Sequence, residues 1–278
     1  SSAQPEAVTA TVAVRLMDSV ADSVVVARVS GNAYGLLGPS DQINAQLVKA
    51  AMAQPLSVAG NPHNVTVTSG FASFEGARLP GADWLKNANM ALKQAKRQAR
   101  GQHIFYTSSI GQEARSRAQL LTDLHAAFDL DHLFMVFQPQ IDLASHELIG
   151  LEALMRWRGT DGQMVPPDRF IPVAEQSGLV VALGEWALNV SCATMRQLLD
   201  LGIGPARMAV NVSVEQFKNA DFVQRVAKAL HSAGLDGNRL ELEITESVAM
   251  LGSQSVEFVL KQLRDMNITI AIDDFGTG

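Results

Sequence analysis

The chain of 278 residues contains one cysteine, no long hydrophobic run and no excess of basic residues. Cys192 alone excludes an internal disulfide and a zinc site built on cysteines, and it fits a reducing compartment. With 22 Lys and Arg against 28 Asp and Glu, the net charge of -6 argues against binding to nucleic-acid polymers. We therefore expect a cytoplasmic protein that has no nucleic-acid polymer as a partner.

Features of membrane targeting are also scarce. No uncharged apolar run reaches the roughly 18 residues that suggest a transmembrane helix, and the segment from Ser1 to Ala10 lacks the basic and apolar regions of a signal peptide. We expect membrane attachment only through domains upstream of Ser1. Because an apolar pattern starts within the first residues, we also expect the sequence to begin inside a domain.

The first third of the sequence alternates strand-like and helical patterns. Residues 24–29 and 34–37 flank a turn in which Gly31 and Asn32 suit a positive φ, so they predict a hairpin. The spacing further predicts strands at 64–71 and 104–106 and a helix at 83–100. These elements predict an α/β domain over residues 1–108, followed by a connecting helix over residues 109–130.

The remainder, residues 131–278, shows a second α/β pattern. Residues 134–138 and 148–157 predict a hairpin, because a turn-rich segment separates them. Downstream, helical segments alternate with strands, which is typical of a parallel barrel of the (β/α) type. The predicted helices are 183–201, 221–233 and 253–266, and the predicted strands are 208–212, 240–244 and 268–272.

Each of these strands has a bulky apolar face and a second face that is small or polar. In a (β/α) barrel the second face lines the interior, and the carboxyl ends of the strands carry the active site. Four carboxylates and one carboxamide would meet there without a nearby lysine, and a divalent cation would offset their repulsion. Oxygen ligands of this kind suit Mg²⁺ or Mn²⁺, and two ions would suit phosphodiester chemistry. The five residues are Glu152, Asn211, Glu243, Asp273 and Asp274.

A single acidic residue at a strand end is usually solvated or capping, so the prediction depends on the joint pattern. Glu241 shares a strand face with Glu243 but lies one pleat deeper, and we leave it outside the ligand set.

At these residues the sequence resembles the EAL family of cyclic di-GMP phosphodiesterases. The signature is Glu152-Ala153-Leu154, within Leu151 to Trp157. Five further motifs follow the family order, and together they span about residues 120 to 278. They are 137–140 (FQPQ), 167–175 (PDRFIPVAE), 211–213 (NVS), 243–247 (EITES) and 273–278 (DDFGTG).

The resemblance implies a metal-dependent hydrolase that opens cyclic di-GMP to linear pGpG. It makes Glu152, Asn211, Glu243 and Asp273 metal ligands, and assigns Asp274 to a second ion or the attacking water. It also implies that Glu246 braces the loop that starts at Asp274. Three further residues would contact the nucleotide, and Arg156 would do so by pairing with a phosphate. These three are Gln138, Leu154 and Arg156.

The first third resembles the C-terminal part of a GGDEF domain, the diguanylate cyclase fold. The signature position reads Ser30-Gly31-Asn32-Ala33-Tyr34, so Asn32 and Ala33 replace two acidic residues of the family. The inhibitory RxxD motif, which would fall at residues 21–24, is absent as well. We therefore expect a degenerate domain without cyclase activity.

The barrel has only 145 residues from Phe134 to Gly278 (278 - 134 + 1), against roughly 250 for a complete barrel. We therefore expect a barrel, like the GGDEF-like domain, that is incomplete within this sequence. The family's catalytic lysine is not among these residues: either the chain continues past Gly278, or it is a fragment with an open half barrel. Three functions stay open: a phosphodiesterase, a receptor that binds cyclic di-GMP without cleaving it, and a structural module. We also expect a homodimer.

Overall fold

The computed structural model describes residues 3–73, 80–98, 100–246 and 254–273. The chain divides into two compact units, Ser1–Ser116 and Arg117–Gly278. The division falls within one helix, α4 (Ser108–Asp129), at the place where the sequence predicts a connecting helix.

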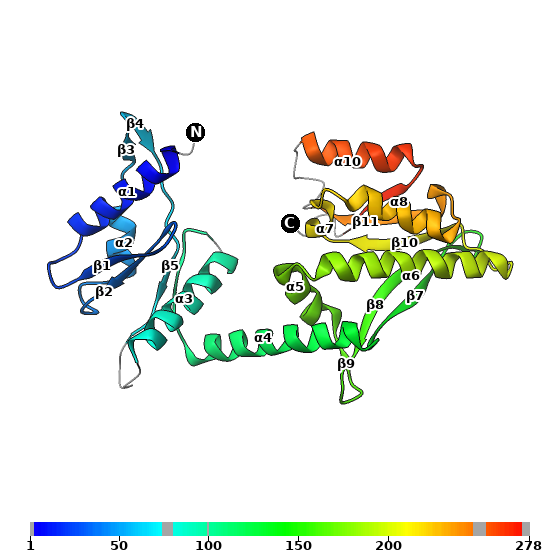
Figure 1. Ribbon diagram of the computed structural model, residues 1–278, viewed down its shortest axis with the longest axis horizontal. Coiled ribbons are helices and arrows are strands. Elements are labelled where there is room, and N and C mark those ends of the chain that lie inside the picture. The colour runs from blue at the N-terminus through cyan, green and yellow to red at the C-terminus, as the bar shows by residue number, and fades with distance from the viewer. Residues whose placement is uncertain (1–2, 74–79, 99, 247–253, 274–278) are drawn as a thin grey trace. The chain divides into compact units, whose positions relative to one another are not determined.

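The first unit is a small α/β domain (Figure 1). Helix α3 covers the short parallel pair β5 and β6, and β1 and β2 form an antiparallel hairpin. The hairpin and the long helix at 83–100 are confirmed, whereas only the last three residues of the strand predicted at 64–71 form a strand. The elements are α1 (Ala3–Asp18), β1 (Val25–Ser30), β2 (Ala33–Leu37), α2 (Ala45–Ala51), β3 (Leu56–Val58), β4 (Asn61–His63), β5 (Ser69–Phe71), α3 (Gly81–Gln98) and β6 (His103–Phe105).

The β1 and β2 hairpin holds the degenerate signature segment. The side chain of Arg28 reaches across the turn, and its Nε donates to the carbonyl oxygen of Gly31 at 3.1 Å. Arg28 also lies opposite Tyr34 in the hairpin register, with a bulge between Arg28 and Ser30. The guanidinium of Arg28 thus stabilises the turn between β1 and β2 through this hydrogen bond.

The second unit is built on a six-stranded mixed sheet. The order along the sheet is β12, β11, β10, β8, β7, and the short β9 pairs with β8. Strands β8, β10, β11 and β12 run parallel, whereas β7 is antiparallel to β8, as the predicted hairpin requires. The strands are β7 (Leu133–Ile141), β8 (Leu148–Arg158), β9 (Met164–Val165), β10 (Arg207–Val212), β11 (Leu240–Thr245) and β12 (Thr269–Asp273).

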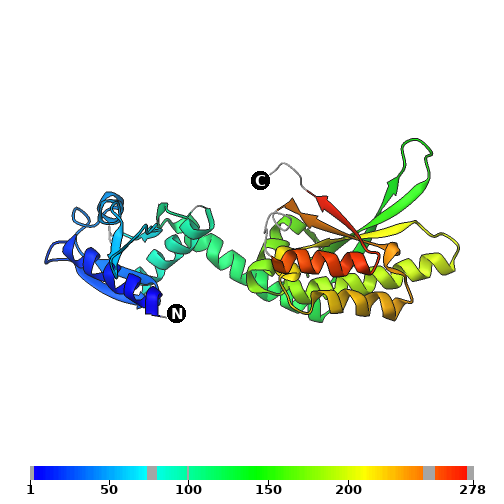
Figure 2. The same cartoon turned by 90° about the horizontal axis from the view of Figure 1, so that it is seen from above.

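Helices α6 (Val180–Asp200), α8 (Phe222–Ala233) and α10 (Gln254–Asp265) lie on one side of this sheet (Figure 2). The apolar strand residues, such as Val210 and Leu242, pack with these helices into the main core. A second core forms where α4 and α5 (Pro167–Ser177) meet Trp157 of β8. Three predicted helices are confirmed, and α1, α2 and α5 are additions that the sequence patterns did not predict. The α/β fold class with a (β/α) barrel is confirmed.

Among the described residues, no single helix has the length and hydropathy of a membrane span; α5 and α6 reach that threshold only as a pair bent by 119°.

Candidate active site

The strand register places the polar strand residues on the face of the sheet opposite the helices. Asn211 of β10 lies directly across from Glu243 of β11, and Asp273 of β12 lies across from Thr245. Glu152 of β8 lies one pleat lower, across from Ala209 and from Gln138 of β7. The alternation read from the sequence therefore brings four expected ligands to one face.

Glu152 and Asn211 are in direct contact. The side-chain amide Nδ2 of Asn211 donates a hydrogen bond to Oε1 of Glu152 at 3.0 Å. Because the strands are parallel and staggered, the longer glutamate side chain spans the difference of one pleat between the two backbones. One carboxylate oxygen of Glu152 is thereby held in place from the neighbouring strand.

Glu243 is half-buried in an acidic environment. Burial, followed by the charges of Glu152, Asp273 and Glu241, raises the pKa of its carboxyl to about 7, and the charge of Arg207 acts in the opposite direction. The interaction with Glu152 and Asp273 shows that these carboxylates lie close enough to repel one another. Shifts of this kind, caused by burial and like charges together, are common at functional sites.

The described residues hold no group of three or more His, Cys, Asp or Glu side chains that is placed to bind a metal ion. The register gives the reason: Glu152 is one pleat below Glu243 and Asp273 is one pleat above it, which is about 7 Å along a strand. The fifth expected ligand, Asp274, lies outside the described residues. The donor chemistry nevertheless suits a hard divalent cation, because it consists of carboxylates and one carboxamide.

The expected nucleotide contacts lie on β7 and β8. Gln138 is exposed, and Leu154 and Arg156 are half-buried on the same face as Glu152. Nη1 of Arg156 donates to the carbonyl oxygen of Met155 at 2.9 Å, which leaves other guanidinium donors for an anion. Glu246 directly follows β11 and is half-buried.

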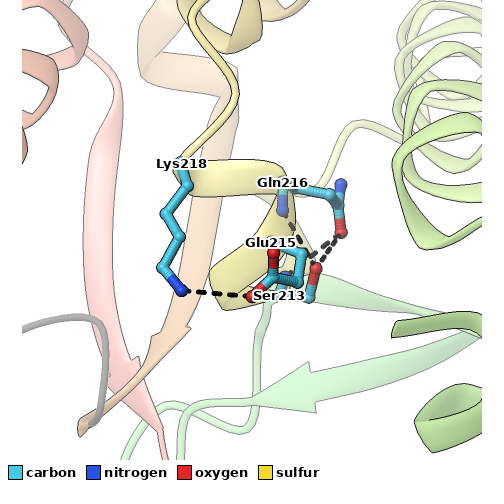
Figure 3. Close-up of polar contacts among 4 residues, drawn as sticks. All are labelled: Ser213, Glu215, Gln216 and Lys218. Carbon is cyan, nitrogen blue, oxygen red and sulfur yellow. Dashed lines mark hydrogen bonds and ion pairs between the residues drawn. The ribbon is translucent and has the colours of Figure 1, made fainter. Parts of the chain in front are cut away.

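The segment after Asn211 is fixed by a capping box. Ser213 caps the N-terminus of the short helix α7 (Val214–Phe217). Its Oγ accepts a hydrogen bond from the backbone N–H of Gln216 at 3.3 Å, and Oε1 of Gln216 accepts one from the backbone N–H of Ser213 at 3.1 Å (Figure 3). Lys218 pairs with Glu215 at 3.1 Å on the same turn. The chain therefore leaves β10 in a defined direction.

An ion pair between Arg207 and Glu241, which the strand patterns alone do not predict, also lies on this face. Nε of Arg207 lies 3.0 Å from Oε2 of Glu241, and the glutamate side chain is only 7% exposed. The signal was present in the alternation, because Arg207 shares a face with Ala209 and Asn211 on β10.

The comparisons with known proteins agree with the resemblance. The EAL domain family matches residues 121–278, and the family described as "Diguanylate cyclase, GGDEF domain" matches residues 3–102. The EAL match covers more than half of the chain, so the protein belongs to the EAL domain family. Its first part is a GGDEF-type segment, as the motifs at residues 30–34 indicate.

Two bacterial signalling proteins illustrate the relationship. The chain is 35% identical over 272 residues to the bifunctional diguanylate cyclase/cyclic di-GMP phosphodiesterase MucR of Pseudomonas aeruginosa, covering 96% of this chain and 40% of MucR. It is 33% identical over 269 residues to the cyclic di-GMP phosphodiesterase NbdA of the same species, covering 95% of this chain and 34% of NbdA. The chain thus spans well under half of either relative.

A solved structure described as the PaMucR phosphodiesterase in complex with c-di-GMP is also similar. It matches with a TM-score of 0.56 at 41% identity, over 58% of this chain and 65% of that chain. The EAL enzyme Bd1971, in its form bound to cAMP and cyclic-di-GMP, matches with a TM-score of 0.57 at 28% identity, over 72% of this chain and 53% of that chain.

Proposed function

We propose that this chain carries metal-binding residues of a phosphodiesterase that hydrolyses cyclic di-GMP to linear pGpG. The observation that carries the proposal is the convergence of Glu152, Asn211, Glu243 and Asp273 on one sheet face, with Asn211 hydrogen-bonded to Glu152. Family membership and the printed activities of MucR and NbdA support the same reaction.

The same four residues would hold Mg²⁺ or Mn²⁺, and Asp274 would complete the set for a second ion. Bound metal would supply an activated water and would stabilise the charge on phosphate and leaving oxygen. The side chains of this protein would position the metal ligands and the substrate. Asn211 orients Glu152, and the guanidinium of Arg156 pairs with a phosphate. Gln138 and Leu154 contact the nucleotide, and Glu246 braces the loop at Asp274.

The test is turnover of cyclic di-GMP by the full-length protein with Mg²⁺ or Mn²⁺, followed by chromatography of pGpG. Glu152→Gln keeps the shape of the side chain and removes its charge, so hydrolysis should fall by at least about 100-fold, a loss typical for key catalytic groups. Glu147→Gln makes the same change at an exposed position of the β7 and β8 hairpin and should leave turnover unchanged.

The same assay separates the other functions. Binding of cyclic di-GMP in EDTA with no turnover in either metal would replace the proposal by a receptor function, and hydrolysis unaffected by Glu152→Gln would refute the assigned ligand set. If cyclic di-GMP does not raise the melting temperature at all, a structural role remains, because a ligand that binds only the folded state must stabilise it.

We also propose that the GGDEF-type unit does not synthesise cyclic di-GMP. Asn32 in the turn and Ala33 at the start of β2 stand where the family has acidic residues, which removes a metal ligand and the neighbouring carboxylate. Incubation of the protein with GTP and Mg²⁺ should yield no cyclic di-GMP by mass spectrometry. Any metal-dependent product would contradict this assignment.

For its setting, we propose a cytoplasmic homodimer. The single thiol, buried at Cys192, supports a reducing compartment. Light scattering during size-exclusion chromatography of the full-length protein measures the oligomeric state, and a mass of one chain would contradict the dimer.

A further inference from the structure

The face of the sheet that bears the expected metal ligands also carries a layer of polar residues just below them. Interior layers of (β/α) barrels are usually filled by bulky branched residues. Here the lower layer contains Gln140 of β7, Gly150 of β8 and Arg207 of β10, and Glu241 of β11 lies one pleat higher, level with Glu152. The register places Gln140 opposite Gly150 and Gly150 opposite Arg207, so three neighbouring strands contribute to one level.

The glycine makes room for this layer. A Cβ added at Gly150 would lie 2.5 Å from Oε1 of Gln140 and 3.3 Å from Cγ of Arg207. Gln140 Oε1 is buried and, within the described part of the chain, has no hydrogen-bond partner. The side chains of Gln140 and Arg207 therefore converge over Gly150, where there is no side chain to displace them.

Arg207 faces one carboxylate directly. Its Nε lies 3.0 Å from Oε2 of Glu241, yet among the described residues this nitrogen makes no aligned hydrogen bond. The contact is therefore mainly a charge interaction. The side chain of Glu241 is only 7% exposed, so solvent screens this charge interaction less than it would on the surface.

Glu241 has the chemistry of a metal ligand and lies two residues before Glu243 on the same strand face, about 7 Å away along the strand. The charges of both Glu241 and Arg207 act on Glu243. We propose that Arg207 and Glu241 form a charge-balancing pair that positions the acidic cluster, and that Arg207 keeps Glu241 out of the metal ligand set. This inference rests on the proposed function for the identity of the ligands.

The experiment measures the affinity of the full-length protein for Mn²⁺ by calorimetry, without substrate. Arg207→Met removes a positive charge and frees Glu241, so Mn²⁺ should bind more tightly. Glu241→Gln removes a negative charge and leaves Arg207 unbalanced, so Mn²⁺ should bind more weakly. Each change should be about three- to tenfold, from one charge acting on a divalent ion across a partly solvated interior. The double variant should return close to the wild-type affinity.

Two further variants control for folding and packing. Arg207→Lys keeps the charge and should keep the wild-type affinity. Gly150→Ala disturbs Gln140 and Arg207 sterically without changing any charge, so it reports the effect of packing alone. A purely structural role of the ion pair would weaken Mn²⁺ binding in both single variants.

The outcomes separate the two proposals. Opposite shifts in Arg207→Met and Glu241→Gln, cancelled in the double variant, support the charge-balancing pair. Shifts in the same direction, or none in either variant, overturn it and leave the phosphodiesterase proposal intact. If the wild-type protein binds no Mn²⁺ at all, the metal-dependent function fails and this inference fails with it.

Discussion

Nδ2 of Asn211 lies 3.0 Å from Oε1 of Glu152, a hydrogen bond that joins two residues 59 positions apart in the sequence. The bond fixes which oxygen of Glu152 is free to face a cation. It also joins the NVS motif on β10 to the EAL signature on β8, so the two motifs form one site.

The first prediction follows from this bond. Asn211→Leu keeps a similar volume but removes both the donor to Glu152 and a ligand oxygen. We expect Mn²⁺ affinity and cyclic di-GMP turnover to fall by about 10- to 100-fold, the range for groups that orient metal ligands. Calorimetry and the pGpG assay measure the two effects. Asn189→Leu, an exposed asparagine on α6, is the matched control, and equal affinities in the two variants would contradict the role of Asn211.

The second prediction concerns pH. The pKa of Glu243 is raised from its ordinary value of 4.5 to about 7, chiefly by burial and then by Glu152, Asp273 and Glu241. Folding therefore favours the protonated carboxyl. The stabilisation this provides is fully present below pH 4.5 and is lost as the pH rises through about 7. In EDTA, the melting temperature should consequently fall between about pH 5 and 8.

Glu243→Gln should remove this part of the pH dependence, because an amide does not titrate in this range. Burial and the charge of Glu215 also raise the pKa of Glu175, so the comparison between variants matters more than the wild-type curve alone. Glu257→Gln, at an exposed site on α10, should leave the curve unchanged. Added Mn²⁺ should weaken the fall, because metal binding requires the deprotonated carboxylate. Identical curves for wild type and Glu243→Gln would refute the assignment.

Much of the fold follows from local patterns. The period of two in β8, β10, β11 and β12 reveals both the helix-packed face and the acid-bearing face, since strand side chains alternate strictly. Helices α3, α4, α6, α8 and α10 follow from apolar spacing and end signals. The predicted strand at 64–71 was too long. β-Branched residues favour strands, but tertiary contacts can override this propensity.

The sequence predicts which strand residues share the polar face of the sheet, but it does not predict their relative levels along the strands. Which pleat of β8 lies beside which pleat of β10 depends on the stagger of parallel strands, and no single segment encodes it. For the same reason the partner of Arg207 was hidden: Arg207 and Glu241 are 34 positions apart and become neighbours only in the sheet. The sequence of a single strand shows which residue types could bind a metal. Which residues face one another, however, depends on the register between neighbouring strands.

The third prediction tests the close contact between α6 and α7. A Cβ added at Gly184 would lie 1.8 Å from Nε2 of Gln216, which belongs to the capping box after Asn211. Gly184→Ala should lower the free energy of unfolding by about 1 to 3 kcal/mol, as overpacked cores do. Denaturant unfolding followed by circular dichroism measures the change.

A double variant checks the cause. If the clash with Gln216 is responsible, Gly184→Ala and Gln216→Ala together should cost clearly less than the sum of the two single changes, because shortening Gln216 removes the steric conflict. Strict additivity would show that Gly184 is needed for some other reason. Gly81→Ala, where no atom lies within 4 Å of the added Cβ, should have little effect.

The last prediction concerns the thiol of Cys192 on α6. The residue is 1% exposed within the main core, and burial raises the pKa of its thiol to about 11. Because the thiolate is the reactive form, the native protein should react very slowly with a disulfide reagent such as DTNB at pH 8, and one thiol per chain should react after unfolding. Ser232→Cys, which places a second thiol at an exposed position of α8, should add one fast-reacting group in the native state. The rate at Cys192 then reports the opening of the core around α6, so rapid labelling of the native wild-type protein would show that the helix is less tightly packed than its burial implies.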